Sequence, residues 1–78
     1  AGSVFRNPSD SYAGMLIENI GYKGKVIGGA KVSEKHANFI INYNKASGSD
    51  IVKLINEIKS KVKEKYDIDL ILEQEIVK

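Results

Sequence analysis

The stretch Gly28-Gly29-Ala30-Lys31-Val32-Ser33-Glu34-Lys35-His36-Ala37-Asn38-Phe39-Ile40-Ile41-Asn42 decides the fold. It joins a Gly-Gly turn, a polar cluster and a run of β-forming residues that ends in asparagine. A Gly-Gly dipeptide tolerates the positive φ angles of hairpin turns, so residues 25–27 and 31–32 are predicted to pair as short strands. Residues 38–43 are predicted as a further strand, and apolar side chains on both of its sides favour a buried position.

A helix is predicted on each side of this region. Upstream, Ala13, Leu16, Ile17 and Ile20 fall at helical spacing, and Gly21 follows as a left-handed C-cap. Its N-cap is expected among three consecutive side chains with acceptor oxygens, Ser9, Asp10 and Ser11.

The downstream helix has the strongest pattern in the chain. Either Ser49 or Asp50 is expected to cap it, and Asp67 is expected to end it. Its apolar stripe comprises Ile51, Leu54, Ile55, Ile58, Val62 and Tyr66.

The two ends of the chain are predicted to be extended. Residues 3–6 form a short strand that Asn7-Pro8 closes, since proline disfavours a helical predecessor. Residues 68–76 alternate between apolar and polar side chains, which predicts a strand with two unlike faces. The sequence therefore predicts an α+β fold: a small two-layer domain with two main helices packed on one face of a short mixed or antiparallel sheet.

Length and composition predict one soluble domain that spans residues 1–78. A domain this small buries only about 60% of the surface of its unfolded chain, so its core is thin. The chain has no cysteine, which excludes disulfides and thiolate metal sites, and its net charge of +2 argues only faintly for a polyanionic partner. No apolar run is long enough to cross a bilayer. The abrupt start at Ala1-Gly2-Ser3 suggests a fragment of a longer protein.

Three segments carry a specific resemblance to a known family. They are the opening Gly2-Ser3-Val4-Phe5-Arg6-Asn7-Pro8, the central stretch quoted above, and Glu64-Lys65-Tyr66-Asp67-Ile68-Asp69-Leu70. Together they resemble the C-terminal, substrate-binding domain of UDP-N-acetylenolpyruvoylglucosamine reductase. Because Pro8-Ser9-Asp10 runs almost directly into the first helix, the chain is similar to the shorter family type, which lacks a substrate-covering loop.

This resemblance implies an oxidoreductase of bacterial cell-wall synthesis. The full-length protein would be a cytoplasmic flavoprotein that uses NADPH and FAD to convert UDP-N-acetylglucosamine enolpyruvate to UDP-N-acetylmuramate for peptidoglycan, and so would serve cell shape and division. In the family, upstream domains hold the flavin and supply the catalytic arginine. The 78-residue chain alone is therefore expected to bind no flavin and to be inactive.

The same resemblance implies two catalytic residues. Ser3 matches the proton-donating serine, which would act as a general acid toward a carbanion-like or enol-like carbon. Glu73 matches a functional glutamate that would help to orient or stabilise that intermediate together with the upstream arginine. The tail departs from the family pattern, with Gln74 and Glu75 in place of Val-Arg. A slip of register in this strand would transfer the role to Glu75.

Two further residues match positions that bind substrate in the family. Asn7 would lie near the polar head of the substrate, while its structural role would be an Asx-type turn before Pro8. Lys23 would lie near the substrate diphosphate, although an exposed loop lysine is more often only solvated. No metal site is predicted, since His36 is the only histidine.

Two other classes of function stay open on the sequence. Gly21-Tyr22-Lys23-Gly24 resembles the phosphate-clamping loop of KH-type RNA-binding modules, in which the loop opens directly into a second helix. The near-neutral charge argues against nucleic acid as a partner. A plain interaction domain that uses the edge of its sheet is the third class.

Overall fold

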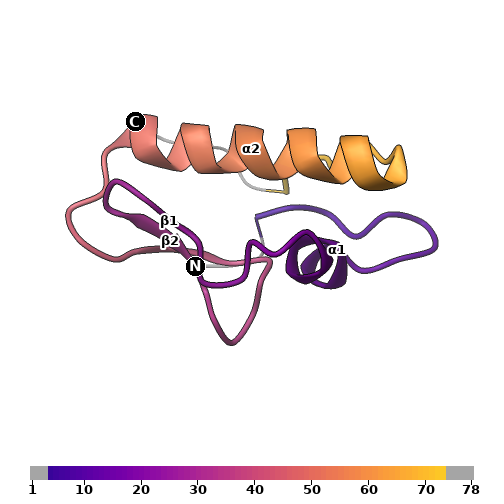
Figure 1. Cartoon of the computed structure of the whole chain (residues 1–78), viewed down its shortest axis with the longest axis horizontal. Coiled ribbons are helices and arrows are strands. Elements are labelled where there is room, and N and C mark those ends of the chain that lie inside the picture. Colours follow the sequence, from indigo (N-terminus) through magenta and orange to yellow (C-terminus); the bar gives the residue numbers. More distant parts are fainter. Residues whose placement is uncertain (1–3, 74–78) are drawn as a thin grey trace.

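The computed structural model describes residues 4–73, which form two α-helices and a three-stranded antiparallel sheet (Figure 1). In chain order the elements are α1 (Ala13–Asn19), β1 (Val26–Ile27), β2 (Ala30–Val32), β3 (Ile40–Asn42) and α2 (Gly48–Tyr66). The strands lie in the order β1-β2-β3, and α2 runs along the sheet and α1 (Figure 1). The predicted α+β fold is confirmed.

The predicted hairpin forms about the Gly-Gly turn. Val26 pairs with Lys31 and Ile27 pairs with Ala30, and Gly28 adopts a positive φ of 56°. Gly29 is needed because of close packing and not because of its φ angle. A Cβ atom at this position would lie 2.1 Å from the carbonyl oxygen of Asn44 and 2.5 Å from the backbone nitrogen of Ala46. The turn is therefore packed directly against the backbone that leads into α2.

A capping box starts α2. The Ser47 hydroxyl accepts a hydrogen bond from the Asp50 N–H (3.1 Å), and the Asp50 carboxylate accepts one from the Ser47 N–H (3.1 Å). The prediction of Ser49 or Asp50 as the N-cap was wrong, because the helix already begins at Gly48 and Asp50 serves as the third residue of the box. The end at Asp67 is confirmed, with this residue in the left-handed conformation (φ 57°).

The predicted C-terminal end of α1 at Gly21 is confirmed, and the predicted N-cap of this helix was wrong. Gly21 (φ 81°) donates to the Glu18 carbonyl and Tyr22 donates to the Ile17 carbonyl, which is a Schellman motif. The start is not capped by the predicted Ser9, Asp10 or Ser11. The N-cap position is Tyr12, whose side chain makes no cap bond. The Asn7 side chain instead accepts a hydrogen bond from the Ala13 N–H (3.0 Å), because the chain turns after Pro8.

Three predicted strands are shorter in the structure than expected. Of residues 3–6, only Phe5 within the described part takes part in β pairing, as an isolated bridge. β3 covers only Ile40–Asn42 and is an edge strand in which Ile41 is 45% exposed, so it is not buried as expected. The C-terminal segment makes a single bridge, between Leu72 and Phe5, instead of a strand over residues 68–76, of which 74–76 lie outside the described residues. Its partner segment runs into Pro8, which has no N–H to extend a ladder. The predicted alternation still holds, since Leu70 is buried while Asp69 and Ile71 are exposed.

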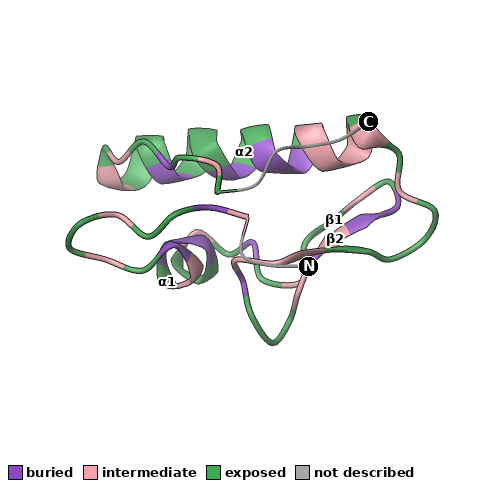
Figure 2. Cartoon of the chain, turned by 180° about the vertical axis from the view of Figure 1, so that it is seen from behind, coloured by how far each residue is buried: buried purple, intermediate pink, exposed green. Residues whose placement is uncertain are grey.

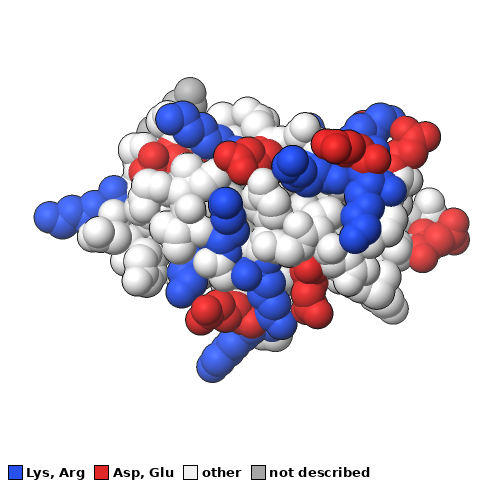
Figure 3. All heavy atoms as spheres, in the orientation of Figure 1, with Lys and Arg blue, Asp and Glu red and all other residues white. Residues whose placement is uncertain are grey.

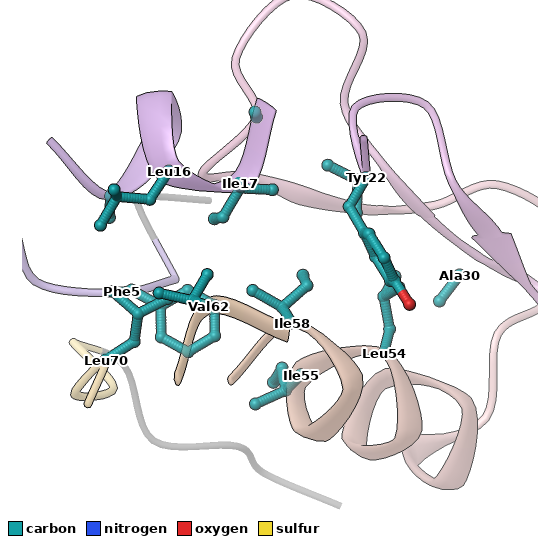
Figure 4. Packing of buried hydrophobic residues seen from close by; sticks show 13 residues of the cluster. Phe5, Leu16, Ile17, Tyr22, Ala30, Leu54, Ile55, Ile58, Val62 and Leu70 are labelled. Carbon is teal, nitrogen blue, oxygen red and sulfur yellow. The ribbon is translucent and has the colours of Figure 1, made fainter. Parts of the chain in front are cut away.

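The core lies between α2 and the layer that contains the sheet and α1. The buried side of α2 faces that layer and its outer side is exposed (Figure 2). The buried cluster comprises Phe5, Ala13, Leu16, Ile17, Tyr22, Ala30, Val32, Ala37, Leu54, Ile55, Ile58, Val62 and Leu70. Phe5, from the amino end, lies beside Leu70, from the carboxyl end, and Val62 of α2 (Figure 4). The core thus joins the two chain ends.

Candidate functional site

The amino-terminal and carboxyl-terminal segments pair with each other. The Glu73 N–H donates to the Val4 carbonyl (2.8 Å), and the Arg6 N–H donates to the Ile71 carbonyl (2.8 Å). These two bonds flank the antiparallel bridge between Phe5 and Leu72. Residues separated by almost the whole chain therefore lie side by side, and Phe5 and Leu70 anchor them in the core.

Asn38 holds the other edge of the amino-terminal segment. Its side-chain oxygen accepts from the Phe5 N–H (2.9 Å), and its side-chain nitrogen donates to the Phe5 carbonyl (2.8 Å). Its backbone carbonyl accepts from the Val4 N–H (2.8 Å). The amide imitates a strand partner for Phe5, so Val4 and Phe5 are held from both sides. No local sequence pattern predicts this contact, because Asn38 lies 33 residues away from Phe5.

Of the two predicted catalytic residues, the structure describes only one. Glu73 is exposed, and its backbone pairs with Val4, the residue that follows Ser3. Ser3 itself and the alternative Glu75 lie outside the described residues. The backbone pairing places Glu73 beside Val4, and the catalytic roles of Ser3 and Glu73 stay predictions.

Asn7 lies at a surface pocket next to this pairing. The pocket has a volume of about 480 Å³ and is lined by residues 6–11 together with Ile68, Asp69 and Ile71. The oxygen of the Asn7 amide is engaged by α1, as described above. The Asx-type turn predicted for Asn7 was therefore wrong, because its amide oxygen accepts from the Ala13 N–H, six residues further along the chain, at the start of α1.

Lys23 lies in a different part of the fold, just after α1. Its ammonium group is 3.2 Å from the Glu18 carboxylate, and both side chains are partly exposed. The neighbouring Tyr22 is buried and donates its hydroxyl hydrogen to Glu57 of α2 (2.7 Å). Burial, and then this hydrogen bond, raises the pKa of Tyr22 to about 12. The contacts of Lys23 do not link it to the paired chain ends.

A match to a family model identifies the family of this chain. The model of "UDP-N-acetylenolpyruvoylglucosamine reductase, C-terminal domain" matches residues 1–77. The chain belongs to this family.

Relatives named UDP-N-acetylenolpyruvoylglucosamine reductase support the same conclusion. The chain is 52% identical over 77 residues to the one from Bacillus subtilis, which covers 99% of this chain and 25% of that protein. It is 54% identical over 79 residues to the one from Fervidobacterium nodosum, which covers 100% of this chain and 26% of that protein. The chain thus spans about a quarter of the length of these relatives.

A solved structure of the family has the same fold. The crystal structure of the reductase from Thermus caldophilus superposes with a TM-score of 0.78 at 38% sequence identity. The match covers 95% of this chain and 26% of that one.

Membership of the reductase family and the local geometry both argue against the KH-like alternative. After Gly21-Tyr22-Lys23-Gly24 the chain enters β1 and not a helix, and the Gly24 N–H donates to the Val32 carbonyl. On the face that Figure 3 presents, basic and acidic side chains are interspersed. No single-sign patch of the kind that nucleic acid favours is visible on that face.

The reductase family implies a flavin cofactor, and the described residues form two hollows that could be considered for it. The pocket at Asn7 has no aromatic side chain to stack on a flavin, and its charged lining side chains are those of Arg6, Asp10 and Asp69. A second hollow of about 390 Å³ is lined by Asn19, Ile20, Lys61, Glu64 and Lys65, and Ile20 is its only apolar residue. Neither hollow fits a flavin.

Residues 4–73 contain neither a metal-ligand cluster nor a membrane-spanning helix. Within this range no three His, Cys, Asp or Glu side chains come close enough together to hold a metal ion. Neither α1 nor α2 is both long and apolar enough to cross a membrane.

Proposed function

We propose that this chain is the substrate-binding and proton-donating domain of a cytoplasmic, NADPH- and FAD-dependent reductase. The reductase converts UDP-N-acetylglucosamine enolpyruvate to UDP-N-acetylmuramate in peptidoglycan synthesis. Upstream domains of the longer protein hold FAD and contribute the catalytic arginine. Family membership over residues 1–77, together with relatives about four times as long, supports this division of labour.

The reaction adds one hydride and one proton to the two carbons of the enolpyruvyl double bond. The cofactors of the longer protein, FAD and NADPH, would supply the hydride, and this chain would supply the proton. Hydride addition to the vinyl carbon leaves carbanion or enol character on the carbon beside the carboxylate. The Ser3 hydroxyl gives its proton to that carbon, and solvent reprotonates the resulting alkoxide. Serine is a weak acid, so it needs accurate placement more than acidity.

The single observation that carries this proposal is the 2.8 Å hydrogen bond between the Glu73 N–H and the Val4 carbonyl. Val4 follows Ser3 directly, so this bond brings the segments that contain the two residues together. In the proposal the exposed Glu73 carboxylate acts on the enol-like intermediate with the upstream arginine. The alternative, Glu75, would follow from a slip of register, and the choice of Glu73 rests on the family resemblance.

The two substrate-binding residues have weaker support. Asn7 lines the 480 Å³ pocket beside the paired ends, and we assign it to the polar head of the substrate. Lys23 is assigned to the substrate diphosphate as a point charge. Its ion pair with Glu18 at 3.2 Å would then have to open when substrate binds.

The test is Ser3→Ala in the full-length enzyme. Product formation should fall by roughly two to four orders of magnitude, the usual contribution of a positioned acid. Reduction of the flavin by NADPH should be nearly unchanged, because it precedes proton delivery. Unchanged turnover would contradict the assignment of Ser3.

A second experiment tests the division of labour between domains. The purified 78-residue chain should be colourless and inactive with NADPH and substrate. Stoichiometric flavin bound to this fragment would contradict the assignment of the cofactor to the upstream domains.

A further inference from the structure

The amide of Asn38 makes a contact that ordinary sheet formation does not require. Asn38 precedes β3 and yet pairs with Phe5, not with a neighbouring strand. Donor and acceptor of one side chain satisfy both backbone groups of Phe5 at 2.8 and 2.9 Å, and the Asn38 carbonyl binds the Val4 N–H at 2.8 Å. Three bonds from one residue thus fix two consecutive residues at the start of the described chain.

We propose that Asn38 is a positioning residue that sets the placement of Ser3 for proton delivery. The inference rests on the proposed function of Ser3. Consecutive Cα atoms are about 3.8 Å apart, so fixing the backbone of Val4 limits how far the residue before it in the chain can shift. Displacement of a reacting group by about 1 Å can reduce a rate by about a hundredfold. Proton transfer from a hydroxyl to carbon is a step of this sensitive kind.

The chemistry at this position is specific to an amide. Phe5 presents an N–H and a carbonyl to Asn38, so its partner needs one donor and one acceptor at the same time. An ionised aspartate of the same shape has only acceptors and would turn an oxygen toward the Phe5 carbonyl. Glutamine keeps both groups but moves them outward by one methylene. The carboxyl-terminal edge, with Leu72 and Glu73, would still hold the segment in these variants.

The experiment uses the full-length enzyme with Asn38→Asp, and with Ile58→Val as a matched control. Ile58 is fully buried in α2 and belongs to the same core, so its shortening lowers the melting temperature without touching the clamp. For Asn38→Asp we expect kcat to fall by about 10- to 100-fold with a nearly unchanged KM for the enolpyruvyl substrate. The solvent deuterium isotope effect on kcat should rise, because the proton step becomes slower.

The control separates positioning from general loss of stability. Ile58→Val should lower the melting temperature and keep kcat. An equal loss of kcat in Ile58→Val, or an unchanged kcat in Asn38→Asp, would overturn the inference. If Asn38→Asp does not fold, Asn38→Gln carries the test under the same criteria.

Ser3→Ala, measured in parallel, distinguishes the two proposals. If Ser3→Ala abolishes proton delivery and Asn38→Asp does not slow it, only the role of Asn38 is wrong. If Ser3→Ala has no effect, the proposed function of this site fails, and with it the inference for Asn38.

Discussion

The two halves of this small domain are fastened by different chemistry. The hairpin half, made of Tyr22, β1, β2 and their Gly-Gly turn, is tied to α2 by carboxylates. Asp50 accepts from the Gly29 N–H at 3.1 Å, and Glu57 accepts from the Tyr22 hydroxyl at 2.7 Å. The terminal half, made of residues 4–6 and 71–73, is held by neutral backbone bonds and the Asn38 amide. Hydrogen bonds to carboxylates make the stability of the hairpin half depend on pH, whereas hydrogen bonds between neutral groups do not have this effect in the terminal half.

This difference indicates a separation of tasks. The hairpin half secures the fold, and its residues are expected to affect stability more than chemistry. The terminal half carries the proposed site, and its fastening is expected to govern reaction rate. Substitutions in the hairpin half therefore test whether the separation is real.

The largest effect on stability is expected for Gly29→Ala. The new Cβ would lie 2.1 Å from the Asn44 carbonyl oxygen and 2.5 Å from the Ala46 nitrogen, and neither backbone atom can move cheaply. Overpacking of this severity should cost about 3 kcal/mol of unfolding free energy. The measurement is denaturant unfolding of the full chain.

Gly21→Ala is the matched control for this substitution. Gly21 has a left-handed backbone (φ 81°), unlike Gly29, and a Cβ there would meet nothing within 4 Å. Its replacement should cost only about 1 to 2 kcal/mol, the penalty of the left-handed conformation. If both substitutions cost the same, close packing at Gly29 is not what the turn requires.

A smaller, pH-dependent effect is expected for Asp50→Asn. Hydrogen bonds from the backbone N–H groups of Gly29, first, and Ser47 hold the pKa of Asp50 below its ordinary value of 3.8. The ionised carboxylate therefore contributes stability above pH 3.8, and this contribution is lost as pH falls through the lower pKa of the folded state. The difference in unfolding midpoint between wild type and Asp50→Asn should be largest near neutral pH and should narrow below pH 3.8. A constant difference would show that the charge is irrelevant.

The smallest effect is expected for Tyr22→Phe. Loss of the bond to Glu57 should cost about 0.5 to 1.5 kcal/mol at neutral pH. The pKa of Tyr22 is raised from 10.0 to about 12, so the neutral phenol stabilises the fold and its contribution is lost as pH rises from 10.0 through about 12. An ultraviolet titration of tyrosinate should contain a step near pH 12 that Tyr22→Phe removes. Persistence of that step in the variant would assign it to another tyrosine.

The sequence predicted those parts of the fold that depend on local periodicity or turn chemistry. The stripe on α2, the hairpin about Gly28-Gly29 and the helix end at Gly21 all follow from neighbours within a few residues. The capping box at Ser47 was missed although a signal was present. Ser47 and Asp50 have the spacing of the box, with aspartate in place of the usual glutamate.

The polar contacts between residues far apart in the sequence could not be predicted from the sequence. Nothing local distinguishes Asn7 from Ser9, Asp10 or Ser11 as the acceptor at the start of α1, because the choice depends on how the chain turns after Pro8. The Asn38 clamp depends on Phe5 being buried against Leu70, which is a property of the assembled core. The residues of the proposed site came from family resemblance, and the pairing of Val4 with Glu73 could be seen only in three dimensions.

The most direct test of the central claim, that Ser3 and Glu73 serve the same proton transfer, is a double-mutant cycle in the full-length enzyme. Ser3→Ala, Glu73→Gln and the double variant are compared by kcat for product formation. If both residues act on one step, the double variant should lose about as much as the worse single variant. If the two losses multiply, the residues act independently, and the pairing of the chain ends does not build a single site.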